Sequence, residues 1–215
     1  MNPSRLLNIL IFFIALVFIT AASAETSENA KPVETKGGAT IHFNRINLQN
    51  MPSLPGVTSR DLSFDSNGIK LKGTLYTPTG ADGPFPGVVV AGAWTTVKEQ
   101  MAGTYARELA ARGFAALAFD FTGWGASGGD IRYKEDPATK TNDIMAAAAF
   151  MSGLKEVDTN RIYGIGICAP SGYMAAAVTD SPHLSKLALV AAWLHDPKMA
   201  EVIYGGPENV AKLVA

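Results

Sequence analysis

The residues best suited to chemistry surround Cys168, the only cysteine in the 215-residue sequence. An apolar segment with interspersed glycines, 161–167, leads into the small-residue turn Gly166-Ile-Cys168-Ala-Pro170. This spacing is typical of a nucleophile elbow, a sharp turn between a strand and a helix that exposes its central side chain. The N–H groups at the start of the following helix would point at the sulfur and favour the thiolate. Cys168 is therefore the candidate nucleophile.

Two other interpretations of this segment are available. Cys168 could be a small apolar residue packed beneath a helix, because free cysteine is among the most buried residue types. Ser171 is a second possible nucleophile, but Tyr173 two residues later would crowd its turn. The elbow pattern favours Cys168 over both alternatives.

Attack on a carbonyl also needs amide donors for the oxyanion that forms. Trp94 lies in a tight turn that follows the apolar run 88–91 and opens a helix, so its amide could point into a crevice. Ala169 directly follows Cys168 and supplies the second candidate amide.

A thiol nucleophile needs a base, and only His183 and His195 follow Cys168. His183 lies in a predicted helix-to-strand connection, at the sheet end opposite the candidate site. His195 follows the last predicted strand at the correct edge and is the candidate base, although its position favours a loop leading to a cap. Asp196 stands beside it, but adjacent residues on an extended segment point to opposite sides, so the two are not expected to act as a pair.

Strands and helices alternate around these residues. Residues 61–64 and 69–76 flank Asp65-Ser-Asn-Gly68 and predict a β-hairpin. Apolar runs then alternate with helical periods, which predicts a mostly parallel sheet with helices on both faces and a ligand site beyond the carboxyl ends of the strands. The strands are expected at 88–91, 114–119, 161–167 and 187–192, and the helices at 98–112, 136–151, 172–179 and 208–214.

The N-terminal residues have the composition of an export signal. Arg5 precedes an apolar run, and Ala22-Ser-Ala24 is a small-residue cleavage site, so we expect an exported protein, periplasmic or secreted, without a membrane anchor after cleavage. Residues 25–55 show no sustained periodicity and are interpreted as an N-terminal arm that precedes a folded domain at 56–215.

The net charge of −1, without a basic run, argues against a nucleic-acid partner. A single cysteine cannot form an internal disulfide bond.

Three segments in order give the chain a family resemblance. The first segment, 157–168, resembles the approach to the nucleophile in α/β-hydrolases. The second, 120–129, resembles their D-x-x-G-x-G-x-S-x-G loop, and the third, 97–100, resembles the start of the helix that follows their oxyanion loop. Within that superfamily the chain is most similar to the dienelactone hydrolase and Xaa-Pro-dipeptidyl-peptidase-like branch. It departs from the branch at Gly92-Ala93, where His-Gly is usual, and at Pro170, where Gly is preferred. Proline is tolerated at a first helical position because its missing N–H would have been unpaired.

The resemblance implies a hydrolase that attacks a small ester or lactone through a covalent acyl-enzyme on Cys168. No metal or organic cofactor is expected, since Gly164-x-Gly166 lacks the third glycine and the acidic residue of a dinucleotide site. In related hydrolases two more strands, carrying the acid and the histidine, would follow 187–192, so we expect a C-terminally truncated domain that lacks its final strands. A non-catalytic binding protein with a hydrolase fold and an Xaa-Pro-type peptidase are the alternatives.

Overall fold

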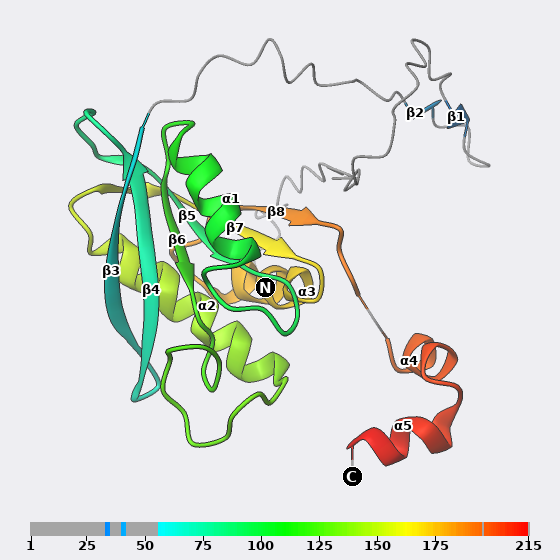
Figure 1. Ribbon diagram of the computed structural model, residues 1–215. Coiled ribbons are helices and arrows are strands. Elements are labelled where there is room, and N and C mark those ends of the chain that lie inside the picture. Colours follow the sequence, from blue (N-terminus) through cyan, green and yellow to red (C-terminus); the bar gives the residue numbers. More distant parts are fainter. Residues whose placement is uncertain (1–32, 35–39, 42–55, 195, 215) are drawn as a thin grey trace, which may run out of the picture. The chain divides into compact units, whose positions relative to one another are not determined.

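The computed structural model describes residues 33–34, 40–41, 56–194 and 196–214 (Figure 1). The predicted export signal and most of the predicted arm lie outside the described residues. Within the arm, strands β1 (Val33–Glu34) and β2 (Thr40–Ile41) pair antiparallel. They belong to a unit of their own, distinct from the unit that contains all the remaining elements.

The larger unit begins with the predicted hairpin. Strands β3 (Val57–Ser66) and β4 (Ile69–Pro78) pair antiparallel along their whole length and are longer than the sequence predicted. The two turn residues, Asn67 and Gly68, have φ angles of 51° and 81°, the left-handed conformation that a two-residue hairpin turn requires. The hairpin prediction is confirmed.

Six strands form the main sheet in the order β3-β4-β6-β5-β7-β8. The pairings β5–β6, β5–β7 and β7–β8 are parallel, whereas β3–β4 and β4–β6 are antiparallel. The elements after the hairpin are β5 (Phe85–Ala91), α1 (Met101–Ala110), β6 (Ala115–Phe119), α2 (Pro137–Ser152), β7 (Val157–Ile167), α3 (Pro170–Asp180) and β8 (Lys186–Val190). Each strand and helix predicted in this region is present, with ends shifted by a few residues.

Helices cover both faces of this sheet (Figure 1). Alternate residues of a strand point to opposite faces, so Val88 and Val90 pack in the cluster that contains the α1 residue Ala106. Val89 belongs to the opposite cluster, together with the α2 residue Ile144 and residues of α3. The central strands are buried on both sides, which is why their sequences are continuously apolar. The predicted mostly parallel sheet with helices on both faces is confirmed.

Helix α1 begins at Met101, three residues later than predicted. The backbone N–H groups of Val97 and Lys98 donate to the side chains of Gln100 and Asp120, at 3.0 and 2.7 Å. These residues therefore form a braced turn before the helix rather than its first turn.

Two short helices follow the sheet, α4 (Pro197–Ile203) and α5 (Pro207–Val214). Helix α5 was predicted, but α4 was not, because its residues were interpreted as loop. Its start signals were present in the sequence, since the Asp196 carboxylate accepts a hydrogen bond from the Met199 N–H at 2.7 Å and proline occupies the first turn.

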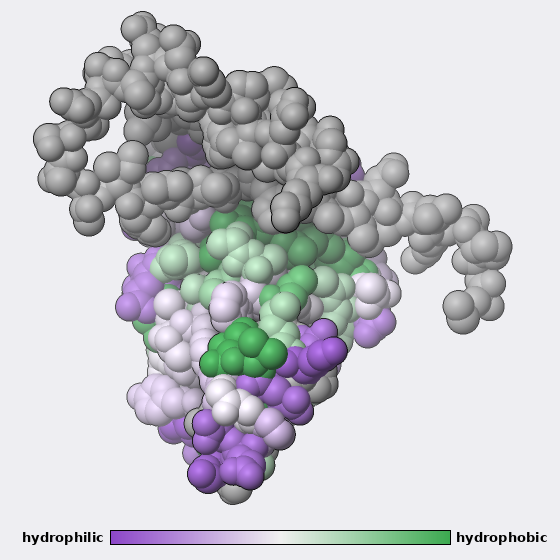
Figure 2. All heavy atoms as spheres, turned by 90° about the vertical axis from the view of Figure 1, so that its right-hand side faces the viewer, coloured by the Kyte–Doolittle hydropathy of each residue, from purple (hydrophilic) through white to green (hydrophobic). Residues whose placement is uncertain are grey.

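Hydrophobic side chains are exposed in the segment that follows β8. The large ones are Trp193, Leu194, Met199, Val202 and Ile203. Hydrophobic residues are also visible on the surface that Figure 2 presents. Among the described helices, none is both long and apolar enough to cross a membrane.

Candidate active site

Three loops leave the sheet at the same edge, where the parallel strands β5, β6 and β7 end. Ala91, the last residue of β5, pairs with Gly166 of β7, and Val90 pairs with Ala118 of β6. The residues that follow these strands are therefore at one level of the sheet, at the carboxyl edge where such folds bind their ligands.

Cys168 lies in the sharp turn between β7 and α3. Its φ angle is 62°, a left-handed conformation that non-glycine residues rarely adopt. Its N–H donates to the Val190 carbonyl at 2.9 Å, and its own carbonyl accepts from the N–H groups of Ser171 and Trp193, both at 3.1 Å. Strained backbone of this kind is held in place by surrounding structure and is concentrated at functional sites.

The side chain of Cys168 is half-buried rather than sealed in the interior. It packs against the apolar cluster on the α1 face of the sheet, which includes Val88 and Ile167. Ala93, from the loop after β5, packs against the same cluster. The cluster thus brings the turn of Cys168 and the loop that carries Trp94 to one region of the edge.

The two amides predicted as oxyanion donors have no acceptor among the hydrogen bonds of the described loops. Neither the Trp94 N–H nor the Ala169 N–H donates there, whereas Gly172 and Ser171 donate to carbonyls of the turn. The Trp94 side chain is exposed. Both amides are consequently available to an added acceptor within the described part of the chain.

Ser171, the alternative nucleophile, is fully buried, and its Oγ donates to the Gly166 carbonyl at 2.9 Å. It fastens the first turn of α3 to the end of β7. Its hydroxyl cannot reach a substrate, so this alternative is not supported.

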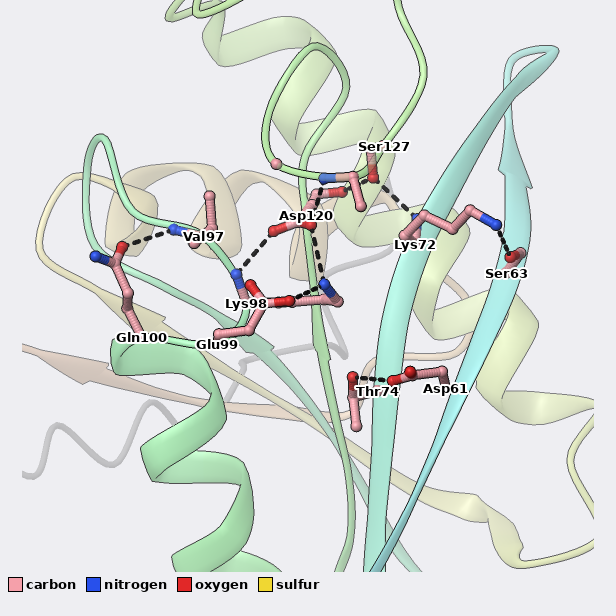
Figure 3. A network of polar contacts seen from close by, with 12 residues as sticks. Asp61, Ser63, Lys72, Thr74, Val97, Lys98, Glu99, Gln100, Asp120 and Ser127 are labelled. Atoms are coloured by element: carbon pink, nitrogen blue, oxygen red, sulfur yellow. Dashed lines mark hydrogen bonds and ion pairs between the residues drawn. The ribbon is translucent and has the colours of Figure 1, made fainter.

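A buried carboxylate, Asp120, joins two of the three loops (Figure 3). Its Oδ1 accepts from the Lys98 N–H at 2.7 Å, and its Oδ2 accepts from the Ala126 N–H at 2.9 Å and lies 3.3 Å from the Lys98 Nζ. The Lys98 Nζ also pairs with the Glu99 carboxylate. Burial acts to lower the pKa of Lys98, but the hydrogen bond with Glu99 and the nearby charges of Glu99 and Asp120 raise it above its usual value.

A second polar network lies beside α3. The Tyr173 hydroxyl donates to the Glu135 Oε1 at 2.9 Å, and the Lys140 Nζ pairs with the Glu135 Oε2 at 2.6 Å. The ammonium group also lies over the rings of Phe121 and Trp124, at 4.7 and 4.6 Å. Burial lowers the pKa of Lys140. The pKa of Tyr173 is raised, mainly by burial and to a smaller extent by the hydrogen bond to Glu135.

A cavity of about 720 Å³ opens between α2 and α3 next to the turn. Its lining includes Met145, Ala169, Tyr173, Trp193 and Leu194. The lining is mainly apolar but also includes Asn142 and Asp180, so it suits a hydrophobic group that carries some polar atoms.

The predicted base, His195, lies outside the described residues. His183 is described, and it lies in the connection between α3 and β8, at the amino ends of the strands and far from Cys168. In the described ranges no cluster of three or more His, Cys, Asp or Glu side chains is arranged to hold a metal ion.

Sequence reasoning missed the roles of Lys98, Glu135 and Lys140. Residues 120–129 were noted as a glycine-rich loop after a strand, but nothing in the sequence indicated that Asp120 contacts a residue 22 positions earlier. Glu135 and Tyr173 are 38 positions apart, and only the packing of α3 beside α2 brings them together.

The family model of FrsA-like esterases matches residues 37–199 of this chain. The chain belongs to the FrsA-like esterase family. That membership, with the strand order and the helices on both faces, makes this an α/β-hydrolase domain, as the sequence resemblance predicted.

Two curated relatives match most of this chain. The uncharacterized protein PA2218 of Pseudomonas aeruginosa is 35% identical over 179 residues, which are 82% of this chain and 47% of that protein. Its crystal structure superposes with a TM-score of 0.67 and 31% identity over 81% of this chain and 56% of that one. The uncharacterized protein YcjY of Escherichia coli is 34% identical over 148 residues, 68% of this chain and 47% of that protein.

A dienelactone hydrolase-like promiscuous phosphotriesterase from metagenomic libraries shares the fold. Its TM-score is 0.55 and its identity 24%, over 67% of this chain and 64% of that one. The chain spans about half the length of the curated relatives it matches.

Proposed function

We propose that this FrsA-like esterase hydrolyses a small carboxylic ester or lactone through a covalent acyl-enzyme on Cys168. The observation that carries the proposal is the left-handed backbone of Cys168, with φ of 62°, in the turn between β7 and α3. A nucleophile elbow needs this strained turn, because it lifts the central side chain away from the strand and the helix. The family match supports the esterase class.

The reaction begins with attack of the Cys168 thiolate on the carbonyl carbon. A carbon–sulfur bond forms, and the carbonyl oxygen becomes an oxyanion that accepts hydrogen bonds from the Trp94 and Ala169 amides. Collapse of this intermediate breaks the ester bond, and the departing alkoxide takes a proton from the protonated base. Water then loses a proton to the base and attacks the thioester, which releases the carboxylic acid and restores the thiol.

The base is proposed to be a histidine, with His195 as the candidate in this sequence. His183 is excluded by its place at the amino ends of the strands. The apolar cavity beside Ala169 is proposed to take the hydrophobic part of the substrate.

The test is hydrolysis of p-nitrophenyl acetate, followed by mass spectrometry of the protein after brief mixing. We expect an acetyl group on the peptide that contains Cys168, and turnover that stops when iodoacetamide has alkylated the thiol. Cys168→Ala should lower kcat by at least about 10³-fold, in line with the loss of other covalent nucleophiles. His195→Gln should lower kcat without preventing alkylation of Cys168.

Two results would contradict the proposal. Hydrolysis that persists in Cys168→Ala would place the chemistry elsewhere. An intact, folded protein that neither turns over the ester nor carries an acetyl group would instead be the binding protein considered from the sequence.

A further inference from the structure

The hydrogen-bond partners of the Asp120 carboxylate among the described residues are all nitrogen donors. Two are backbone amides, those of Lys98 and Ala126, and the third is the Lys98 ammonium group. The side chain of Asp120 is fully buried, so these contacts replace the water that it would otherwise bind. A methyl group on Gly125 would collide with this carboxylate, which is why the loop wraps around it at a glycine with φ of 49°.

The loop that carries Trp94 depends on this anchor. Within the described residues, its hydrogen bonds are internal, from the N–H and Oγ1 of Thr96 to the Ala93 carbonyl and between Val97 and Gln100. The loop is joined to the residue that follows strand β6 by one backbone hydrogen bond, which the Lys98 N–H donates to the Asp120 carboxylate (Figure 3).

From this arrangement we infer that Asp120 is a positioning residue for the oxyanion site, holding the loop so that the Trp94 amide faces the carbonyl attacked by Cys168. The inference rests on the proposed function. Asp120 does not touch the substrate in this role, and it acts through the backbone of residues 94–98. An amide donor stabilises an oxyanion only when it is aimed in advance, so release of the loop should slow acylation.

Asparagine cannot replace Asp120. One of the two oxygens becomes an NH₂ group, which then faces either the Lys98 N–H or the Ala126 N–H, and neither can accept a hydrogen bond. The amide oxygen is favoured at the Oδ2 position, where it accepts from both the Ala126 N–H and the Lys98 ammonium group, so the NH₂ group faces the Lys98 N–H. Asp120→Asn therefore keeps the shape of the side chain but loses the tie to the loop that carries Trp94.

The chain supplies a matched control in Asp143. This carboxylate is equally buried and also accepts three hydrogen bonds, from the Ser66 Oγ at 2.6 Å and from the N and Oγ1 of Thr122 at 2.8 and 3.0 Å. Two of its three partners are hydroxyls, which can rotate and accept from an NH₂ group. Asp143→Asn therefore makes the same chemical change and leaves the hydrogen bonds satisfied.

The experiment compares two reactions of Cys168 in each variant. Acetylation by p-nitrophenyl acetate passes through an oxyanion, whereas alkylation by iodoacetamide does not and reports the reactivity and access of the thiol. We expect Asp120→Asn to slow acetylation by about 10²-fold, the effect of losing one oxyanion donor, while alkylation stays within about 3-fold of wild type. Asp143→Asn should change neither rate by more than about 3-fold.

Equal acetylation rates in Asp120→Asn and wild type, or a parallel fall of acetylation and alkylation, overturn the inference while leaving Cys168 as the nucleophile. A wild-type protein that is alkylated but never acetylated overturns the proposed function and the inference with it. If Asp120→Asn fails to fold, Lys98→Pro carries the test, because proline suits the second position of the turn 97–100 but has no backbone N–H to donate to Asp120. Lys98→Met, which keeps that N–H and removes only the ammonium group, is its control. We expect acetylation about 10-fold slower in Lys98→Pro than in Lys98→Met, with alkylation equal in the two variants, and equal acetylation rates refute the inference.

Discussion

Gly166 and Ser171 approach so closely that a methyl group on Gly166 would lie 2.7 Å from the Ser171 Cα atom. The same methyl group would lie 2.7 Å from the Pro170 carbonyl oxygen. The first turn of α3 therefore rests directly on the last residues of β7, and this contact sets the position of Cys168 between them.

Gly166→Ala should destabilise the protein by about 2–3 kcal/mol, because the added methyl group meets backbone atoms that cannot move aside. Urea unfolding measures the change. Gly172→Ala is the control, since its methyl group would meet only the Leu194 Cδ2 atom, at 3.3 Å, and alanine favours the helix. A Gly166→Ala protein as stable as Gly172→Ala would contradict the close approach.

Because the turn at position 168 is strained, glycine should be more stable there than alanine. At an ordinary position glycine is less stable than alanine, by roughly 0.5–1 kcal/mol in a helix or strand. At φ of 62° the order should reverse, because the left-handed conformation costs alanine about 1–2 kcal/mol and glycine almost nothing. Cys168→Gly should therefore unfold at a higher urea concentration than Cys168→Ala, although both lack the thiol. The opposite order would show that the turn is relaxed.

Glu135 carries the only carboxylate partner of Lys140 among the described ion pairs. Glu135→Gln removes the carboxylate that pairs with a buried ammonium group, and we expect a loss of about 2–3 kcal/mol, moderated by the rings of Phe121 and Trp124 and by the nearby charge of Asp143. Chemical unfolding at neutral pH measures it. Glu156→Gln is the control, because its ion pair with Arg60 is exposed and should contribute less than about 1 kcal/mol. Equal losses in the two variants would contradict the buried character of the Lys140 pair.

Burial raises the pKa of Asp143 above the ordinary value of 3.8. The folded protein therefore binds this proton more tightly than the unfolded chain does, and the associated stability is lost as pH rises from about 3.8 through the raised pKa. Asp143→Asn removes that dependence, so its stability relative to wild type should improve across this pH range. Urea unfolding at a series of pH values tests the prediction, and a constant difference between the two proteins would refute it.

The sequence predicted the sheet and the position of Cys168 because both depend on local patterns. Apolar runs identify buried strands, and the small residues around Cys168 identify a tight turn. Prediction was weaker at the ends of elements, where side chains decide the outcome. Helix α1 starts late because Asp120 and Gln100 bind the amides of the preceding turn, and α4 was missed although Asp196 is a good capping residue.

The polar networks could not be predicted at all. The contacts of Asp120 with Lys98 and of Glu135 with Tyr173 join residues from different loops and helices. They follow from the parallel pairing of β5 with β6 and from the packing of α2 beside α3, which no spacing along the chain encodes.

Asp143 has a consequence for protein engineering. Its carboxylate connects helix α2 to Ser66 in the hairpin and to Thr122 in the glycine-rich loop. Mutant libraries restricted to the neighbourhood of the thiol would leave these distant positions unsampled, although they join three separate elements of the domain. Ser66 and Thr122 are therefore sensible sites to randomise when a more stable protein is sought.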